Sequence, residues 1–345
     1  RGGLSLDVVS FSAAISACEK GEQWHKIPLL VDQMREVGLQ PELDMFTRAI
    51  SAYAKSGQWE DALLLFDSMR KEGIEPDIIC FNAAIDACGK GGEWERALSL
   101  LDEMERDGIA PNLISFNSAI SACASAGQWE AALALLDAMQ EEGVAPDVIS
   151  YTTAISACEK SAEWQHALRL KDEMREKGLQ PNLITFNTAI SACEKGGQWR
   201  SAVQLLDEMR KDSIAPDVIS FSAAILACGK VDQSEKALSM LDEMYNESIA
   251  PNQNTYFAAM LACGNAEQWQ RALELFDDMR NEGMSPNFHC YKAVMYACEK
   301  GEQQPRALDF YDEMCEAGLA PKDPTWSSTS EPTMPSSTLE VGVPG

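Results

Sequence analysis

Hydrophobic and polar positions in this chain follow a helical period. In residues 81–88 the apolar side chains fall at i, i+3, i+4 and i+7, the spacing of one helix face: Phe81, Ala84, Ile85 and Cys88. A second stripe at helical spacing follows: Trp94, Ala97, Leu98, Leu101 and Met104. Gly91 and Gly92 separate the stripes, because glycine accepts the left-handed turn after a helix end. Gly108 and Pro111 end the second stripe, so this segment predicts two antiparallel helices.

The same pattern recurs every 35 residues, as from Pro41 to Pro76. A proline closes each unit: Pro41, Pro76, Pro111, Pro146, Pro181, Pro216, Pro251, Pro286 and Pro321. An aromatic residue opens each unit: Phe11, Phe46, Phe81, Phe116, Tyr151, Phe186, Phe221, Tyr256 and Tyr291. Units this small cannot bury a core alone and become stable only by stacking on their neighbours. We therefore predict an all-α fold, a right-handed superhelical solenoid of 35-residue helix-turn-helix repeats, by analogy with other helical repeats.

The period divides most of the chain into nine predicted repeats: 8–42, 43–77, 78–112, 113–147, 148–182, 183–217, 218–252, 253–287 and 288–322. Residues 1–7 are interpreted as the remnant of a truncated upstream repeat, with Leu6 where the proline should stand. We expect further repeats and any targeting peptide to precede Arg1 in the full protein. Residues 323–345 are rich in Ser, Thr and Pro without a helical period, which predicts a disordered tail.

Most of the 11 cysteines keep a single phase in the repeat: Cys18, Cys88, Cys123, Cys158, Cys193, Cys228, Cys263 and Cys298. Equivalent positions on stacked helices should lie about 10 Å apart, whereas a disulfide needs Cα atoms within about 7 Å. These cysteines are therefore interpreted as small core residues of a protein in a reducing compartment. With no Cys-x-x-Cys pair and 3 histidines, we expect no metal site. We expect no cofactor either.

The charge pattern separates two kinds of surface. The formal net charge of −26 works against unselective nucleic-acid binding, which depends on phosphate neutralisation. Acidic residues concentrate in the predicted second helices and should face away from the inner groove, as at Asp102-Glu103 and Asp207-Glu208. Lysines recur at the end of the first helices, with these five as candidate phosphate contacts: Lys55, Lys90, Lys160, Lys195 and Lys230. They could equally complement the helix dipole, and one residue can do both.

A helical hairpin of this length with an opening aromatic and a closing Gly-x-x-Pro-Asp/Asn resembles the pentatricopeptide repeat family. The segments Gly143–Asp147 and Val148–Thr152 carry the resemblance most closely. All units have one length, which is similar to the P-type subclass. The resemblance implies that each repeat recognises one base of single-stranded RNA. It also implies that the residue after the opening aromatic and the residue after the closing proline choose the base together. We call these two residues a recognition pair.

The resemblance assigns a base to six pairs: Thr47 with Asp77 (guanine), Asn82 with Asn112 (pyrimidine), Asn117 with Asp147 (uracil), Thr152 with Asn182 (adenine), Asn187 with Asp217 (uracil) and Ser222 with Asn252 (adenine). The predicted target is 5′-GYUAUA-3′, where Y is a pyrimidine. Three other pairs fit no standard combination: Ser12 with Glu42, Phe257 with Asn287, and Lys292 with Lys322. We expect the last two repeats to cap the stack. Turn and cap chemistry also explains Asp or Asn after proline. It does not explain Asn, Ser or Thr after the aromatic, because these are mediocre helix formers.

Two residues before each aromatic, the resemblance implies an aliphatic side chain that stacks on the bases: Val9, Ile79, Ile114, Ile149, Ile184 and Ile219. Asp44 breaks this series in the second repeat and weakens the guanine assignment. Asn254 and His289 break it near the end of the repeats.

Three functions were compared. Sequence-specific RNA binding in an organelle, chloroplast or mitochondrion, with a role in RNA processing, stability or translation, is the leading hypothesis from the resemblance. Its partners would be single-stranded RNA and protein effectors, with no membrane, and we expect a monomer. The alternative is a protein-binding helical scaffold, which an acidic surface suits better. An enzyme is disfavoured, because no acid/base, nucleophile or metal constellation is visible.

Overall fold

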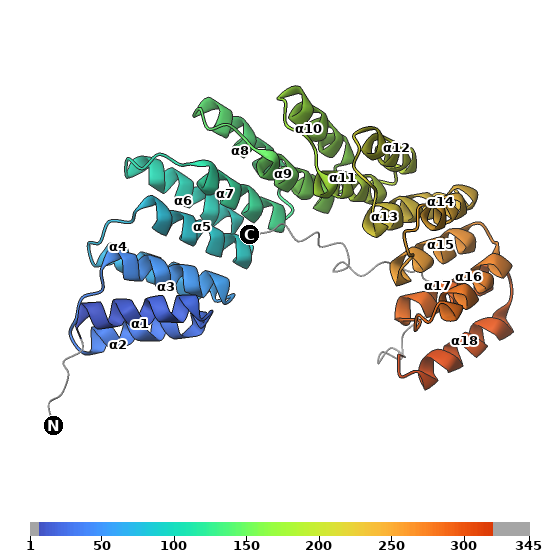
Figure 1. Ribbon diagram of the computed structural model, residues 1–345, viewed down its shortest axis with the longest axis horizontal. Coiled ribbons are helices and arrows are strands. Elements are labelled where there is room, and N and C mark those ends of the chain that lie inside the picture. The colour runs from blue at the N-terminus through green and yellow to red at the C-terminus, as the bar shows by residue number, and fades with distance from the viewer. Residues whose placement is uncertain (1–6, 320–345) are drawn as a thin grey trace. The chain divides into compact units, whose positions relative to one another are not determined.

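The computed structural model describes residues 7–319, and every regular element in that range is a helix (Figure 1). The elements are α1 (Val8–Lys20), the 3-10 helix η1 (Trp24–Lys26), α2 (Ile27–Glu36), α3 (Leu43–Lys55), α4 (Trp59–Lys71), α5 (Ile78–Gly91), α6 (Trp94–Arg106), α7 (Leu113–Ser125), α8 (Trp129–Glu141), α9 (Val148–Lys160), α10 (Trp164–Glu176), α11 (Leu183–Lys195), α12 (Trp199–Lys211), α13 (Val218–Gly229), α14 (Ser234–Asn246), α15 (Gln253–Asn265), α16 (Trp269–Asn281), α17 (Phe288–Lys300) and α18 (Gln304–Glu316). The predicted all-α repeat fold is confirmed. Apart from Asp7, the predicted remnant at 1–7 and tail at 323–345 lie outside the described residues.

The residue after each closing proline starts the next first helix. Asn112 is the N-cap of α7, where its Oδ1 accepts from the backbone N–H of Ser115 at 3.0 Å. Ser115 Oγ accepts in return from the N–H of Asn112 at 3.2 Å, which completes a capping box. The same box begins α9, α11, α13 and α15. The local sequence around each proline therefore sets where a repeat begins.

Each second helix ends in a left-handed turn. Gly108 has φ 75°, and its N–H donates to the carbonyl of Glu105 at 3.0 Å. The next N–H, of Ile109, donates to the carbonyl of Met104 at 2.8 Å. These bonds satisfy carbonyls at the end of α6, and the chain then leaves the helix toward Pro111.

The helices form two compact units: Arg1–Ser161, which holds α1 to α9, and Ala162–Gly345, which holds α10 to α18. In the first unit α3, α5, α7 and α9 pack side by side, and α4, α6 and α8 each contact the first helices before and after them (Figure 1). The second unit repeats this arrangement with α11, α13, α15 and α17 as the inner row. A first helix inside a unit thus contacts four others, as α5 contacts α3, α4, α6 and α7. This close packing explains why small residues occupy the first helices.

The core of both units consists of the residues that recur in phase. In the third repeat Phe81, Ile85, Cys88 and Met104 are fully buried. The in-phase cysteines from Cys88 onward are buried as well, as predicted for small core residues. Burial, the largest cause, raises the pKa of the Cys88 thiol to about 12. A thiol in such a place is inert at neutral pH.

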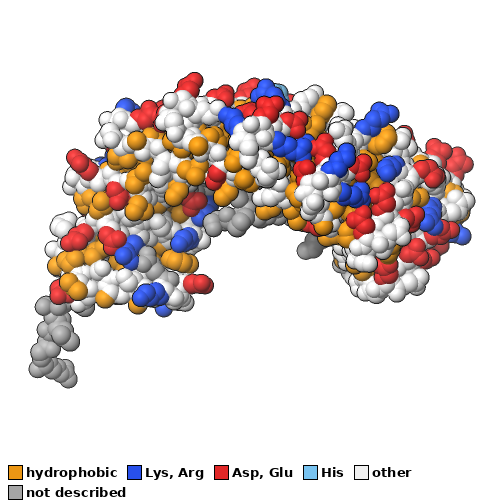
Figure 2. Space-filling view, turned by 45° about the horizontal axis from the view of Figure 1, so that its top comes forward, with side chains coloured by type: hydrophobic (Ala, Val, Ile, Leu, Met, Phe, Trp, Pro, Cys, Tyr) orange, Lys and Arg blue, Asp and Glu red, His pale blue; other side chains and the backbone are white. Residues whose placement is uncertain are grey.

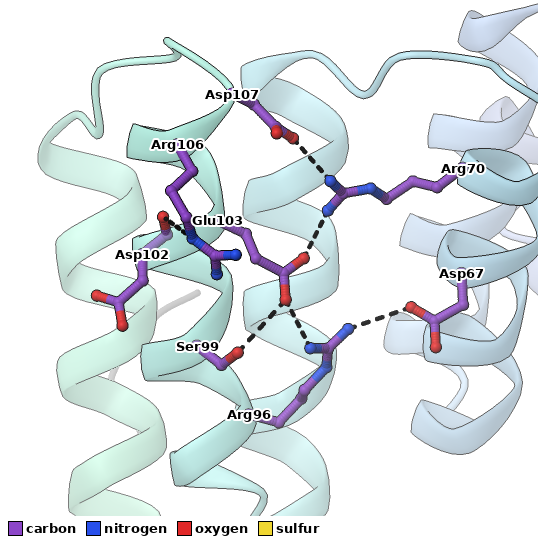
Figure 3. Close-up of polar contacts among 8 residues, drawn as sticks. All are labelled: Asp67, Arg70, Arg96, Ser99, Asp102, Glu103, Arg106 and Asp107. Atoms are coloured by element: carbon purple, nitrogen blue, oxygen red, sulfur yellow. Dashed lines mark hydrogen bonds and ion pairs between the residues drawn. The ribbon is translucent and has the colours of Figure 1, made fainter.

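Ion pairs join consecutive second helices on the outer side of the stack. Arg70 on α4 bonds Glu103 Oε2 at 2.5 Å and Asp107 Oδ2 at 3.0 Å beyond α6 (Figure 3). Arg96 on α6 bonds the other oxygen of Glu103 at 2.8 Å and reaches back to Asp67 at 3.1 Å (Figure 3). Some of the acidic residues predicted for the second helices, such as Glu103, therefore have an arginine partner from a neighbouring repeat.

An arginine follows the in-phase methionine in several second helices but not in α6, where the residue is acidic. Arg35, Arg70 and Arg210 each pair with a carboxylate 37 residues further on, at 2.7, 3.0 and 2.8 Å. Glu105 occupies the equivalent position on α6, and Glu142 stands 37 residues beyond it. Partial burial raises the pKa of the Glu142 carboxyl, and a hydrogen bond and the charge of Glu105 raise it further. Two acids thus meet where an ion pair lies elsewhere.

No helix within residues 7–319 is long and apolar enough to span a bilayer.

Candidate nucleic-acid interface

Within each unit, the two residues of a predicted recognition pair stand on successive first helices. Asn117 lies in the second turn of α7, directly after the buried Phe116. Its partner Asp147 is the N-cap of α9, so the pair spans two repeats although the residues are 30 apart in sequence. The intervening second helix, α8, returns the chain so that α9 packs beside α7, and this packing brings the two residues together.

The pair Asn117–Asp147 forms a closed polar cluster with Ser150. Asn117 Nδ2 lies 3.4 Å from Asp147 Oδ1, and the hydroxyl of Ser150 donates to Asn117 Oδ1 at 2.6 Å. Asp147 Oδ1 also accepts from the N–H of Ser150 at 2.8 Å, which caps α9. The carboxylate of Asp147 therefore starts a helix and orients a recognition side chain at once.

The second unit contains the same cluster. Asn187 Nδ2 donates to Asp217 Oδ1 at 3.2 Å, and Ser220 Oγ bonds Asn187 Oδ1 at 2.5 Å. Asp217 Oδ1 caps α13 through the N–H of Ser220 at 2.9 Å. Asn187 is 3% exposed, so contact from outside is limited to one edge of the amide. Both pairs predicted for uracil thus have one geometry.

Among the described residues, no hydrogen bond joins the two side chains of three other predicted pairs: Thr47–Asp77, Asn82–Asn112 and Ser222–Asn252. The Asn82 amide oxygen accepts from Ser115 at 2.6 Å instead, and the Ser222 hydroxyl shares a bond of 2.8 Å with Thr255. Thr47 Oγ1 donates back to the carbonyl of Leu43 at 3.0 Å. Thr152 belongs to the first unit and Asn182 to the second, so this pair stays a prediction.

Exposed aliphatic side chains accompany the pairs. Ile79 is 61% exposed, Ile114 60% and Ile149 47%. Ile184 and Ile219 are half-buried, and Val9 at the start of α1 is exposed. Single exposed aliphatic residues are ordinary on a protein surface, whereas a contiguous apolar row can mark a binding site. These residues stand where the stacking role was predicted, and that role stays a prediction.

The lysines predicted as phosphate contacts have partners within the protein. Lys90 Nζ lies 2.8 Å from Asp86 on the same helix. Lys230 Nζ lies 2.5 Å from Glu194, a carboxylate that is only 3% exposed. A buried carboxylate needs a counter-charge. Lys230 therefore has a structural task, and the phosphate role stays a prediction.

The remaining lysines of this group also end their helices. Lys55 Nζ lies 4.2 Å from the ring centre of Trp24, in a cation–π contact. Lys160 Nζ lies 3.5 Å from the carbonyl of Ser125, and Lys195 stands in the last turn of α11. Cations at helix C-termini are favoured by the dipole in any case.

The comparisons with known proteins decide the family. A model described as "Pentatricopeptide repeat domain" matches residues 29–91, 99–161, 169–231 and 239–301, and a model described as "PPR repeat" matches 79–109, 149–179 and 219–249. The chain belongs to the pentatricopeptide repeat family. A search of curated protein sequences found no match.

Solved pentatricopeptide repeat structures share the fold. The crystal structure of PPR10 from maize is 24% identical, with a TM-score of 0.67 over 92% of this chain and 50% of that one. PPR10 in complex with an 18-nt psaJ RNA element is 25% identical, with a TM-score of 0.51 and the same coverage. The chain thus spans about half the length of the solved relative that it matches.

The eighth pentatricopeptide repeat lacks a polar recognition residue. Phe257 is 2% exposed and makes an edge-to-face contact with His289, with ring centres 6.1 Å apart. The two residues that depart from the recognition and stacking patterns therefore pack on each other. The capping role of the last two repeats stays a prediction. Lys322 lies outside the described residues.

The sequence interpretation missed one set of residues, which stand at the third position of the first helices: Ser115, Ser150, Ser220 and Thr255. Each makes a hydrogen bond to the polar residue after the aromatic of the preceding repeat. The signal was present, since Ser or Thr recurs directly before the opening aromatic. It was hidden because a hydroxyl at this position also fits helix capping.

Within residues 7–319 no group of three or more His, Cys, Asp or Glu side chains could hold a metal ion.

Proposed function

We propose that this pentatricopeptide repeat protein binds single-stranded RNA in a sequence-specific manner, one base per repeat. The observation that carries the proposal is the repeated cluster of Asn, Asp and Ser at Asn117 and Asn187, next to a row of exposed isoleucines. The PPR10 structure in complex with RNA supports it, because that protein has the same fold. Edge hydrogen bonds and aliphatic stacking are the two contacts an unstacked base can make.

The Asn–Asp pair matches uracil in hydrogen-bond pattern. An amide Nδ2 donates and a carboxylate only accepts. Uracil offers a carbonyl acceptor beside the N3–H donor, so both groups of Asn187 and Asp217 can be satisfied by one Watson–Crick edge. Cytosine presents the lone pair of N3 instead, which would face the carboxylate. An unpaired polar group in such a site costs about 1–3 kcal/mol, which is the range needed for base discrimination.

The pair Asn82–Asn112 discriminates less. Its second member is an amide, which can turn to donate or accept, so either pyrimidine can bond it. Combined with the other pairs, this gives the proposed target 5′-GYUAUA-3′. The guanine assignment is the weakest, because Asp44 replaces the aliphatic residue and bonds Arg48 at 2.8 Å.

The acidic charge limits where phosphates can lie. On the face drawn in Figure 2, acidic side chains are interspersed with Lys and Arg. Many arginines are already paired on the second helices, as Arg70 is with Glu103. Phosphate contacts would therefore fall to the lysines that end the first helices. We expect few such contacts and a shallow salt dependence of the Kd.

A double substitution tests the proposal. Asn187→Thr with Asp217→Asn should reverse the preference at the fifth base from uracil to adenine, because the pair then equals Thr152–Asn182. Asn also caps helices well, so α13 should keep its start. The Kd for RNAs with U or A at the fifth base, measured at one salt concentration, is the readout.

The same change at Asn117 and Asp147 is the matched control. It should reverse the preference at the third base and leave the fifth base unchanged. A double variant that keeps uracil preference at the fifth base would overturn the one-base-per-repeat proposal.

A protein-binding scaffold is the second candidate. A groove between α14 and α16 is lined by acidic residues, among them Glu235, Asp242, Glu267 and Glu274. Failure of an RNA selection to enrich any sequence at low salt would favour this function. The RNA-binding proposal also includes the P-type subclass, a single-chain state, no enzymatic activity and an organellar role in RNA processing. Imaging of the full-length protein in cells tests the location.

A further inference from the structure

We infer that the Ser or Thr at the third position of a first helix is a positioning residue for base recognition in the preceding repeat. It rests on the proposed function. In this role the hydroxyl fixes which side of the recognition amide faces the base. The residues concerned are Ser115, Ser150 and Ser220, which bond asparagines, and Thr255, which bonds the hydroxyl of Ser222.

The contact is short, buried and repeated. The Ser hydroxyls lie 2.6, 2.6 and 2.5 Å from the Oδ1 atoms of their asparagines, which stand 33 residues earlier. Ser115, Ser150 and Ser220 are all 0% exposed. A buried hydroxyl must bond its neighbours, and no water competes for its single proton. The N-cap oxygen lies farther from each hydroxyl, at 3.1, 2.9 and 2.9 Å, so we assign the proton to the closer amide oxygen.

Both neighbours of the amide favour one orientation. In the second unit Ser220 donates to Asn187 Oδ1, while Asp217, which can only accept, lies 3.2 Å from Nδ2. The reversed amide would place Oδ1 against the carboxylate. With this orientation held, the second hydrogen of Nδ2 points away from Asp217 and is available to a base carbonyl. Without the hydroxyl, Oδ1 loses its donor, and Asp217 alone still favours this orientation.

Helix capping alone does not require the hydroxyl. The helices α5 and α17 have cysteine at this position, and their N-caps still bond the backbone: Cys80 N to Asp77 at 2.8 Å, and Cys290 N to Asn287 at 3.0 Å. The difference lies 33 residues earlier. Thr47 and Phe257 stand there, whereas asparagine stands 33 residues before each of the three serines.

Serine stands where there is a recognition amide to orient. Cys290 follows Phe257, which has no polar group, and Cys80 follows Thr47, whose hydroxyl donates to the carbonyl of Leu43 on its own helix. Met45 follows Ser12, whose pair is not a standard one. The three asparagines in the recognition position are each followed by serine. A residue needed only to begin a helix would not follow the identity of a side chain on another helix.

The test measures base discrimination in Ser220→Ala, with the Asn187–Asp217 pair intact. The Kd is measured for 5′-GCUAUA-3′ and for the same RNA with cytosine at the fifth base. Loss of one net hydrogen bond predicts that the preference for uracil falls about fivefold. Ser220→Thr should retain the preference, because it keeps the hydroxyl, and Ser220→Cys should behave like the alanine variant.

Ser150→Ala is the matched control, because its cluster is the same in the other unit. It should reduce uracil preference at the third base only, as Ser220→Ala does at the fifth only. If either alanine variant fails to fold, the other still tests the positioning role at its own base. Equal weakening for uracil and cytosine, or a threonine variant that behaves like alanine, would overturn the positioning role. A wild-type protein without uracil preference at either base would instead overturn the proposed function, and the inference with it.

Discussion

Replacing Glu105 by arginine should repair the gap in the ion pairs between second helices. Glu105 faces Glu142, whereas Arg70 and Arg210 at this position face a carboxylate and lie over the next opening aromatic. Arg70, for example, lies 5.9 Å from the ring centre of Phe81. In Glu105→Arg the new guanidinium would reach Glu142 and the buried Phe116 in the same way.

The expected gain follows from three small contributions. An exposed ion pair adds about 0.2–1 kcal/mol, a cation–π contact about 0.5–1 kcal/mol, and removal of the like-charge contact about 0.2–0.5 kcal/mol. Ala138 stands where Glu103 stands opposite Arg70, so a second ion pair is not formed. We expect a total of about 1–2 kcal/mol, or a Tm higher by about 2–6 °C.

Thermal unfolding followed by circular dichroism measures this gain, with Glu105→Gln as the control. The glutamine removes the repulsion but forms no ion pair, so its gain should be smaller. The raised pKa of Glu142 also sets the pH dependence. Because the folded state holds that proton more tightly, this carboxyl stabilises the wild type below its ordinary pKa of 4.5, and the contribution is lost as pH rises.

The advantage of Glu105→Gln over wild type should therefore be largest at neutral pH and shrink toward pH 4. An arginine variant no more stable than the glutamine variant at pH 7 would refute the ion-pair reasoning. A glutamine advantage that does not change with pH would refute the assignment of the carboxyl pair.

Three further predictions concern packing and binding. Gly91→Ala should cost about 1–3 kcal/mol by overpacking, because the added Cβ would lie 2.4 Å from the Trp59 ring, whereas Gly89→Ala in the same helix has ordinary contacts and should be neutral in chemical denaturation. Lys171→Leu should lower the unfolding free energy by about 1–3 kcal/mol, because it removes the cation nearest to Glu208 and leaves that carboxylate to Arg175, and an unchanged unfolding free energy would contradict this. Ile114→Ser should weaken RNA binding by about 1–3 kcal/mol through lost stacking and leave the Tm unchanged, since the side chain is 60% exposed.

The fold could be predicted from the sequence because the information is local and repeated. Pro111, Asn112 and Phe116 mark the end of one repeat and the start of the next, and eight neighbours confirm the phase. A single such segment would be ambiguous between a turn and a helix start. Repetition at a constant interval removes that ambiguity.

The candidate site was predictable only in part. The pair Asn117–Asp147 could be placed from the resemblance, but the bond from Ser150 could not, because it depends on how closely α7 and α9 pack. The contact of Glu105 with Glu142 was invisible for the same reason, since it joins residues on two helices of different repeats. Lys230 looked free for phosphate until its buried partner Glu194 was seen.

Residues such as Asp147 have two roles, and under the proposed function this limits which RNA sequences the protein can recognise. A side chain at that place must suit a nucleotide and also begin α9, so only residues able to do both are admissible. Glu42 does not meet the second requirement, because its side chain makes no capping hydrogen bond at the start of α3. New specificities should therefore be engineered with Asp, Asn, Ser or Thr at this position, because these residues also cap the helix that follows.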